Sequence, residues 1–166
     1  MAPEKHPLLE GIRVVEVASM IMAPSAATVL SDYGAEVVKI EPPGVGDQNR
    51  YLHQLTGLPV SDIPYAFFQV NRNKRSVALD LKNDAARGAL TKLIERADIF
   101  ITNYREPALK KLKLTWDDVQ AVNPRTIYAW ATGHGEKGPE AGRPAYDTIV
   151  FWARSALEAS LFPVDG

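Results

Sequence analysis

The sequence predicts an α/β fold in which a parallel β-sheet carries helices on both faces. The first observation is the stretch 11–41, where two runs rich in β-branched residues, 12–17 and 36–40, flank a helical segment that opens at Pro24 and ends before Gly34. So short a connection demands a parallel strand pair with a right-handed crossover. The second observation is that strand-like runs and amphipathic helical patterns keep alternating downstream, which is typical of a covered parallel sheet.

The remaining elements follow in order. Residues 41–64 are predicted to be irregular because prolines and glycines interrupt them, with one short helical piece at 51–55. Residues 65–70 have an apolar, strand-like composition, and a half-exposed strand is expected over 76–81. The later expectations are a helix begun by the N-cap Asn83, a buried strand at 98–102, a helix at 107–112, a helix begun by Thr115, a buried strand at 126–132, and a last helix from Ala145 to about Leu161.

Composition limits the function classes. The 166 residues carry a formal charge of -1 and no cysteine, which excludes a disulfide framework, a thiolate zinc site and a cysteine nucleophile. The balanced charge gives no argument for nucleic acid or for a membrane surface. No apolar run approaches the ~18 residues of a membrane span, and the N-terminus lacks the apolar core of a signal peptide. We therefore expect a cytoplasmic protein.

Ligands of open parallel sheets bind outside the carboxyl ends of the strands, so the segments after each strand are the candidate sites. The segment 18–24 contains no glycine, although a dinucleotide-binding protein needs several there for backbone to approach a pyrophosphate. This is strong evidence against NAD or FAD. Met20 and Met22 fit core packing and an apolar wall beside a flexible ligand about equally well.

Four further segments contain candidate functional residues. Arg72, Lys74 and Arg75 form a basic run that either binds phosphate or is a solvated turn. Lys110 and Lys111 fit favourable charges at a helix C-terminus. The segment 103–105 follows a strand, and its tyrosine either packs partly or stacks on a planar base. His134 stands alone in a glycine-rich loop, 133–139, without a neighbour at metal-ligand spacing, so no metal is expected.

Collinear motifs across nearly the whole chain resemble one known family. They are L-x-G-I-R-V-V-E-V at 9–17, D-Y-G-A-E-V-V-K-I-E-P-P-G-x-G-D at 32–47, N-R-N-K-R-S-V-A-L-D-L-K at 71–82, A-D-I-F-I-T-N-Y at 97–104, and G-H-G-E-K-G-P with P-A-Y-D between 133 and 147. This pattern resembles the N-terminal part of class III CoA-transferases, the group of formyl-CoA transferase and α-methylacyl-CoA racemase. The stretch 133–154 most resembles the branch acting on 2-hydroxyacyl and aryl-lactate substrates.

The resemblance implies a Rossmann-like domain over residues 1–166 that binds coenzyme A rather than NAD, as the N-terminal portion of the family's large domain. It places Ile21 and Met22 along the CoA or acyl channel and the run with Arg72, Lys74 and Arg75 near the CoA phosphates. Asn103, Tyr104, Ala108 and Lys111 would lie at the adenine end. Gly133, His134, Gly135 and Tyr146 would face the thioester. The family also implies an acyl-CoA donor, a carboxylic acid acceptor and a dimer of interlocked chains.

The family's nucleophile is an aspartate that attacks the acyl-CoA thioester, giving a mixed anhydride and CoA thiolate, and the anhydride is then passed to the acceptor acid. By the family's order this aspartate is expected after Gly166, with the small domain and a returning segment, and Asp165 does not match its motif. The racemases have His before Asp where this chain has Tyr146, which favours transferase over racemase. The alternatives are a non-enzymatic CoA-binding or dimerising module and a racemase.

Overall fold

The computed structural model describes residues 7–146 and 148–161, in two compact units that meet in the chain between Ala131 and Thr132. The first unit is built on a five-stranded sheet in the order β3-β2-β1-β4-β5, with every neighbouring pair parallel. The strands are β1 Arg13–Val17, β2 Glu36–Glu41, β3 Arg75–Ala78, β4 Ile99–Thr102 and β5 Ile127–Trp130. The parallel α/β prediction is confirmed.

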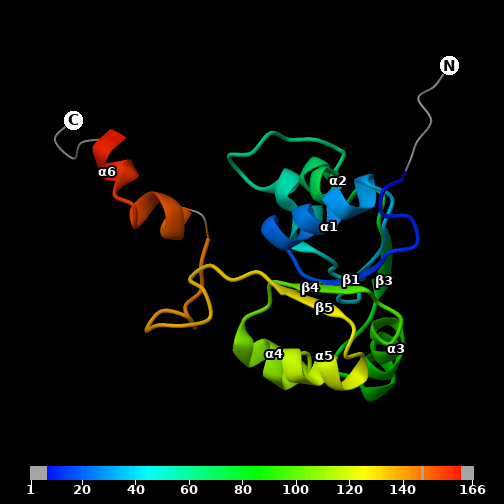
Figure 1. The fold of residues 1–166 in the computed structure, drawn as a ribbon. Helices are drawn as coiled ribbons and strands as arrows, with labels where there is room; N and C mark the ends of the chain where they lie inside the picture. The colour runs from blue at the N-terminus through cyan, green and yellow to red at the C-terminus, as the bar shows by residue number, and fades with distance from the viewer. Residues whose placement is uncertain (1–6, 147, 162–166) are drawn as a thin grey trace. The chain divides into compact units, whose positions relative to one another are not determined.

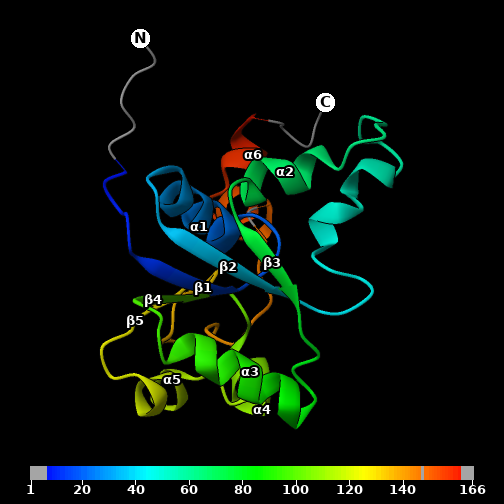
Figure 2. The same cartoon turned by 90° about the vertical axis from the view of Figure 1, so that its right-hand side faces the viewer.

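Helices cover both faces of this sheet (Figures 1 and 2). One face carries α1 Met22–Asp32 and α2 Tyr65–Asn71, and the opposite face carries α3 Asp84–Ile94, α4 Glu106–Leu112 and α5 Trp116–Val122. The connection after β2 contains two 3-10 turns, η1 Gln48–Arg50 and η2 Leu52–Gln54, where the sequence predicted a short helical piece. Because the chain order reverses between β1 and β4, their carboxyl ends form the crevice where such sheets bind ligands.

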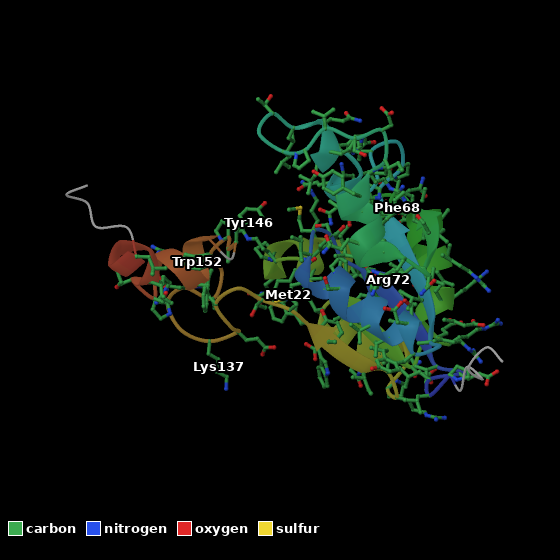
Figure 3. All side chains as sticks on the ribbon, turned by 90° about the horizontal axis from the view of Figure 1, so that it is seen from above. Met22, Phe68, Arg72, Lys137, Tyr146 and Trp152 are labelled. Carbon is green, nitrogen blue, oxygen red and sulfur yellow. The ribbon has the colours of Figure 1, made fainter. Side chains whose placement is uncertain are left out.

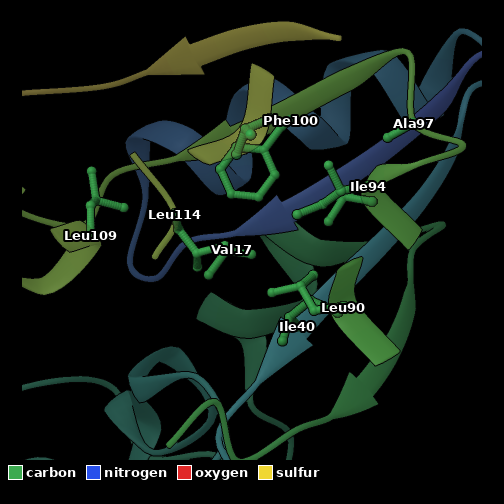
Figure 4. Close-up of a cluster of buried hydrophobic side chains, with 10 residues drawn as sticks. Val17, Ile40, Leu90, Ile94, Ala97, Phe100, Leu109 and Leu114 are labelled. Carbon is green, nitrogen blue, oxygen red and sulfur yellow. The ribbon is translucent and has the colours of Figure 1, made fainter. Parts of the chain in front are cut away.

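Two apolar cores hold the layers together. The core under α3, α4 and α5 is shown in Figure 4, where Phe100 from β4 and Leu90 from α3 meet Val17 and Ile40 from the central strands. The core under α1 is made mostly of small side chains, among them Ala23 and Ala27 of α1 against Val14 and Val37 of the sheet. Small residues let α1 lie close to the strands, which leaves little room between the helix and the sheet.

Most of the predicted helix signals are confirmed, but α1 begins at Met22 rather than at Pro24, which lies inside its first turn. The Asn83 side chain accepts a 2.8 Å hydrogen bond from the backbone N of Ala85 at the start of α3. Thr115 and Asp118 form a reciprocal capping box at the start of α5. Gly34, just after α1, has φ +102°, a conformation that glycine adopts without steric cost.

Four predictions about elements are wrong. Residues 65–71 form a helix rather than a strand-like segment, because Phe67 and Val70 are spaced to bury one helical face. The strand predicted as buried at 126–132 is β5, which is only half-buried. The strand predicted as half exposed at 76–81 is β3, which is exposed throughout. Both are edge strands of the sheet, which explains their exposure. The single helix expected from Ala145 is instead a π-helix, Thr148–Ala153, and α6, Leu157–Leu161, separated near Ala156 with φ +57°.

The second unit contains the π-helix and α6. No helix within residues 7–146 and 148–161 is long and apolar enough to cross a membrane. In that same part of the chain, no three potential metal-ligating side chains lie grouped together.

Candidate functional site

Buried charges lie beneath the carboxyl end of the sheet. Glu16 of β1 and Lys39 of β2 are register partners, and their side chains form a 2.6 Å ion pair at 0% and 1% exposure. Lys39 also contacts a carboxylate oxygen of Asp47 at 2.8 Å, and Lys74 contacts the second oxygen of Glu16 at 2.7 Å. Two ammonium and two carboxylate groups therefore share one water-excluded site, which we call the buried charge network.

The network shifts the two lysines in opposite directions. Burial alone would lower the pKa of Lys39, but Glu16 and Asp47 together outweigh it and raise that pKa above its usual value. Burial lowers the pKa of Lys74, against the opposing effect of the Glu16 carboxylate. Lys39 lies between two carboxylates, whereas Lys74 is paired with one, which explains the difference.

A second ion pair anchors the loop after β2. The Arg50 guanidinium donates two hydrogen bonds to the Glu41 carboxylate, at 2.8 and 2.7 Å, and lies over the Phe67 ring at 3.7 Å. Glu41 also accepts from the Ser76 hydroxyl and from the backbone N of Asp47. Burial opposes ionisation, but these donors prevail and lower the pKa of Glu41 to about 2.

The turn after β1, Ser19–Met20, is held by side chains from other segments. Asn103 accepts from the backbone N of Ser19 at 3.1 Å and donates to its O at 2.7 Å. Asp47 accepts from the backbone N of Met20 at 3.4 Å, and Asn49 donates to its O at 2.6 Å. The predicted glycine-free turn is therefore fixed by hydrogen bonds.

A cavity of about 330 Å³ lies beside this turn, and we call it the α1–α2 cavity. Its apolar lining faces a few polar groups, which is the usual character of a small-molecule site. Figure 3 labels Met22 at the start of α1 and Phe68 and Arg72 near α2. The lining residues are Ile21, Ser25, Thr28, Val29, Asn49, Leu52, Ala66, Gln69, Val70 and Arg72.

Ile21 and Met22, the residues predicted to form an apolar wall beside the ligand, lie at the start of α1, next to the α1–α2 cavity. Ile21 and Met22 are 60% and 55% exposed, although both are large and apolar. Neither side chain belongs to an apolar core. The sequence left open whether Met22 packs in the core or forms an apolar wall beside a ligand, and core packing is wrong. Their contact with a CoA or acyl group stays a prediction.

The residues of the basic run lie in different environments in the structure. The Lys74 ammonium is 2% exposed and already contacts Glu16, the backbone O of Pro24 and of Val70, and Asn71. Arg72 pairs with Asp32 at 2.5 Å, and its hydrogen bond lowers the pKa of that carboxyl. Arg75 is exposed at the start of β3. Phosphate binding stays a prediction, and the exposed guanidinium groups of Arg72 and Arg75 are the members that reach solvent.

The residues predicted for the adenine end lie after β4. Tyr104 is half-buried against the core under α3–α5, and burial raises the pKa of its phenol. Its backbone O accepts a 2.9 Å hydrogen bond from Trp130. Ala108 is half-buried in α4 and Lys111 is exposed in the last turn of the same helix. Their role in binding adenine stays a prediction.

The residues predicted to face the thioester belong to the second unit. A Cβ at Gly133 would meet the Ala145 Cβ at 2.0 Å, and Gly135 has φ +79°, so both positions require glycine. His134 is half-buried and Tyr146 is 57% exposed. Their thioester contact stays a prediction, and Asp147 lies outside the described residues.

Sequence reasoning missed Glu16, Lys39 and Asn49, and it included Glu41 and Asp47 only as the ends of a candidate segment after a strand, without giving them a role. A usable signal exists, because Glu16 and Lys39 each interrupt a β-branched run that is otherwise apolar. Opposite charges inside two neighbouring buried strands must be paired to be tolerated. Nothing in the sequence identifies Asn49 as buried, since it lies in the segment predicted to be irregular.

Comparison with known proteins agrees with the fold and with the motifs. The family described as CoA-transferase family III matches residues 9–160. The (R)-2-hydroxy-4-methylpentanoate CoA-transferase of Clostridioides difficile is 39% identical over 93% of this chain, and the cinnamoyl-CoA:phenyllactate CoA-transferase of Clostridium sporogenes is 36% identical over 93%. These matches cover 39% and 38% of the relatives, so the chain spans about two fifths of their length.

Solved structures give the same result. The protein Rv3272 of Mycobacterium tuberculosis superposes with a TM-score of 0.80 at 36% identity, covering 94% of this chain and 42% of that one. A CAIB/BAIF family protein from Brucella suis superposes with a TM-score of 0.78 at 32% identity, covering 87% and 38%. The collinear motifs, the parallel sheet and these matches together show that the chain belongs to CoA-transferase family III.

Proposed function

We propose that the whole protein transfers coenzyme A between an acyl-CoA and a carboxylic acid, and that this chain supplies much of the CoA-binding part. The observation that carries the proposal is the family match over residues 9–160, with relatives whose names describe CoA-transferases. The turn after β1 supports binding of acyl-CoA rather than NAD. It has no glycine that would let its backbone approach a pyrophosphate, as NAD binding needs, and exposed, large apolar side chains follow it.

In the proposed mechanism, an aspartate beyond Gly166 acts as the nucleophile. Its carboxylate oxygen attacks the thioester carbonyl carbon, the C–S bond breaks, and a mixed anhydride and CoA thiolate form. The acceptor carboxylate then attacks the aspartyl carbonyl carbon, which releases the donor acid and leaves the acceptor in the mixed anhydride. The thiolate, which must stay bound, attacks the acceptor's carbonyl carbon, and breaking of the C–O bond gives the new thioester and the free aspartate. The part of the site in this chain would hold the CoA, with Ile21 and Met22 along its acyl end, and Arg72 and Arg75 near the phosphates.

The acceptor class is proposed from the relatives. Both named relatives act on 2-hydroxy acids with an apolar side chain, as their names state for 2-hydroxy-4-methylpentanoate and phenyllactate. The α1–α2 cavity, about 330 Å³ and lined by Ile21, Val29, Leu52 and Val70, has a size and polarity suited to such a side chain. We further propose a homodimer of the full-length protein and a cytoplasmic location.

Mass spectrometry of CoA thioesters tests the transfer. The full-length protein is mixed with an acyl-CoA donor and a panel of free acids, with and without a 2-hydroxyl group, and new thioesters are identified by mass. Transfer to 2-hydroxy acids with loss of the donor thioester is expected. α-Proton exchange in deuterated water without transfer would identify a racemase, and CoA binding without either reaction would identify a binding module.

Two further measurements test the mechanism. Hydroxylamine added during turnover should trap an activated enzyme carboxyl group as a hydroxamate, located by peptide mass spectrometry on an aspartate beyond Gly166. The 166-residue chain alone is expected to show no turnover. Clear turnover by this chain would contradict the placement of the nucleophile.

A further inference from the structure

The Ser19–Met20 turn has an unusual degree of support. Its backbone groups, with the preceding carbonyl of Ala18, are bonded by side chains that lie at least 21 residues away in sequence. Lys39 donates to the Ala18 O at 3.0 Å, and the asparagines and Asp47 take the N and O of the two turn residues. No helix or strand ladder supplies these bonds, so the side chains determine the backbone conformation of the turn.

Met20 needs this support because of its backbone conformation. It has φ +66°, in the left-handed region that costs a residue with a Cβ free energy. Such conformations persist where the surroundings over-determine them, and they cluster at ligand sites. For Met20 the surroundings are Asp47 and Asn49, which hold its N and its O from one short segment after β2.

Asn49 is buried at a cost. The residue is 1% exposed, and its Oδ1 receives no hydrogen bond from the described part of the chain. Leaving a buried acceptor unsatisfied is unfavourable, so its presence calls for a reason. The one hydrogen bond that its side chain makes within the described residues is the 2.6 Å bond to the Met20 O, and its own backbone N donates to Asp47 at 2.9 Å.

The residues that follow the turn show what the support achieves. Ile21 and Met22 begin α1 directly after Met20 and stay largely exposed at the carboxyl end of the sheet. Ile21 and Asn49 both line the α1–α2 cavity. A rotation of the Met20 peptide would redirect both exposed side chains, because they begin the helix that the turn leads into.

We propose that Asn49 is a positioning residue for the acyl-CoA site. It acts through the Met20 carbonyl, keeping the turn in its left-handed conformation so that Ile21 and Met22 form a preformed apolar wall. This rests on the proposed function, since the wall is taken to contact the acyl-CoA. Preorganised walls lower the entropic cost of binding, and a loosened turn gives up that advantage.

The test compares two asparagines with the same structural task at opposite ends of the sheet. Asn123 is half-buried, whereas Asn49 is fully buried, and the Asn123 side chain donates to the backbone O of Ile94 and Ala97 before β4. Asn49→Ala and Asn123→Ala are made in the full-length protein, and CoA binding is measured by calorimetry. Asn49→Ala should weaken CoA binding at least tenfold and raise the acyl-CoA KM more than it lowers kcat. Asn123→Ala should lower the melting temperature while leaving the CoA dissociation constant within twofold.

Met20→Gly supplies a second route that does not depend on the folding of the first variant. Glycine accepts φ +66° without strain, so the melting temperature should stay close to that of the parent while CoA binding weakens because the turn is freer. In a double-mutant cycle, Asn49→Ala should have a smaller effect on binding in the Met20→Gly background, since Asn49 acts through Met20.

The outcomes separate the two proposals. If the unsubstituted full-length protein does not bind CoA, the proposed function fails and this inference fails with it. If it binds CoA, and Asn49→Ala binds as tightly as Asn123→Ala or the two effects in the cycle simply add, the positioning role is overturned while the proposed function stands.

Discussion

Glu16 and Lys39 lie directly opposite each other on β1 and β2, and their 2.6 Å ion pair is almost completely excluded from water. The pair holds together segments that come from distant parts of the chain, because Lys74 binds the second Glu16 oxygen and Lys39 reaches Asp47. Burying charges is costly, so such a network is retained only where each member is paired. Its position beneath the candidate site links the stability of the fold to the shape of the turn above it.

Replacing Glu16 should strongly destabilise the protein. Glu16→Gln leaves two ammonium groups, Lys39 and Lys74, beside a neutral amide, and breaking a buried pair in this way costs about 3–5 kcal/mol. Urea denaturation of the purified variant measures the loss. Asp84→Asn is the control, because the Asp84 side chain is 91% exposed in its pair with Arg87 and should cost under ~1 kcal/mol. Equal losses in the two variants would contradict the network's role.

The Glu41 carboxyl should make stability fall in acid. Its pKa is about 2 in the folded protein against an ordinary value of 4.5, so between these values the unfolded chain binds more protons. Stability from Glu41 is therefore complete above pH ~4.5 and is lost as the pH falls towards 2, by up to about 3 kcal/mol. Denaturation at pH 6 and pH 3 should show a smaller loss for Glu41→Gln than for the parent. Identical losses would show that Glu41 is not the responsible group.

Two glycines should respond in opposite directions to alanine. Gly34 has φ +102°, and an added Cβ would meet the Pro7 Cβ at 2.3 Å, so Gly34→Ala should cost roughly 1–2 kcal/mol or more. Gly88 lies inside α3 with nothing within 4 Å of an added Cβ, so Gly88→Ala should stabilise by about 0.5–1 kcal/mol. Thermal melts of both variants provide the measurement, and a stabilised Gly34→Ala would contradict the contact with Pro7.

Arg75, one of the two exposed arginines of the basic run, should contribute to CoA binding. Arg75→Gln removes a guanidinium that has no part in the buried charge network, and should weaken CoA binding by about tenfold if Arg75 meets a phosphate. The effect should shrink at high salt, because exposed charges are screened. Calorimetry at two salt concentrations tests this. Lys92→Gln, an exposed cation on α3, should leave the dissociation constant unchanged, and a similar loss there would point to net charge alone.

Local signals in the sequence were sufficient for many elements. The β-branched runs around α1, the N-cap Asn83 and the capping box at Thr115 act over a few residues, and the structure confirms each of them. The segment 65–71 was misread because its aromatic composition suits strands, whereas burial of Phe67 and Val70 on one helical face decided the outcome. Composition alone does not reveal which face a neighbouring helix will cover.

The sheet topology predicts where the candidate site lies, whereas tertiary contacts determine which side chains are available in it. A parallel sheet predicts that ligands bind after β1 and β4, at the carboxyl ends of the strands. The absence of glycine from the turn after β1 can be read directly from the sequence. The sequence placed Lys74 in a phosphate-binding run, yet its ammonium is surrounded by acceptors of the chain itself. Asn103 was predicted near adenine, and its side-chain amide is hydrogen-bonded to the backbone N and O of Ser19.

By itself, the sequence determined the parallel α/β fold, the absence of a cysteine-based site and the family, because periodicity, composition and collinear motifs are properties of residue order. Only the tertiary structure decided that Glu16, Lys39, Asp47 and Lys74 form one buried network, and that Asn49 holds Met20. The pairs of Glu16 with Lys39 and Lys74, and of Met20 with Asn49, join residues 23 to 58 positions apart. Charges become partners at such separations only after the strands have aligned and water has been excluded, which no local pattern encodes.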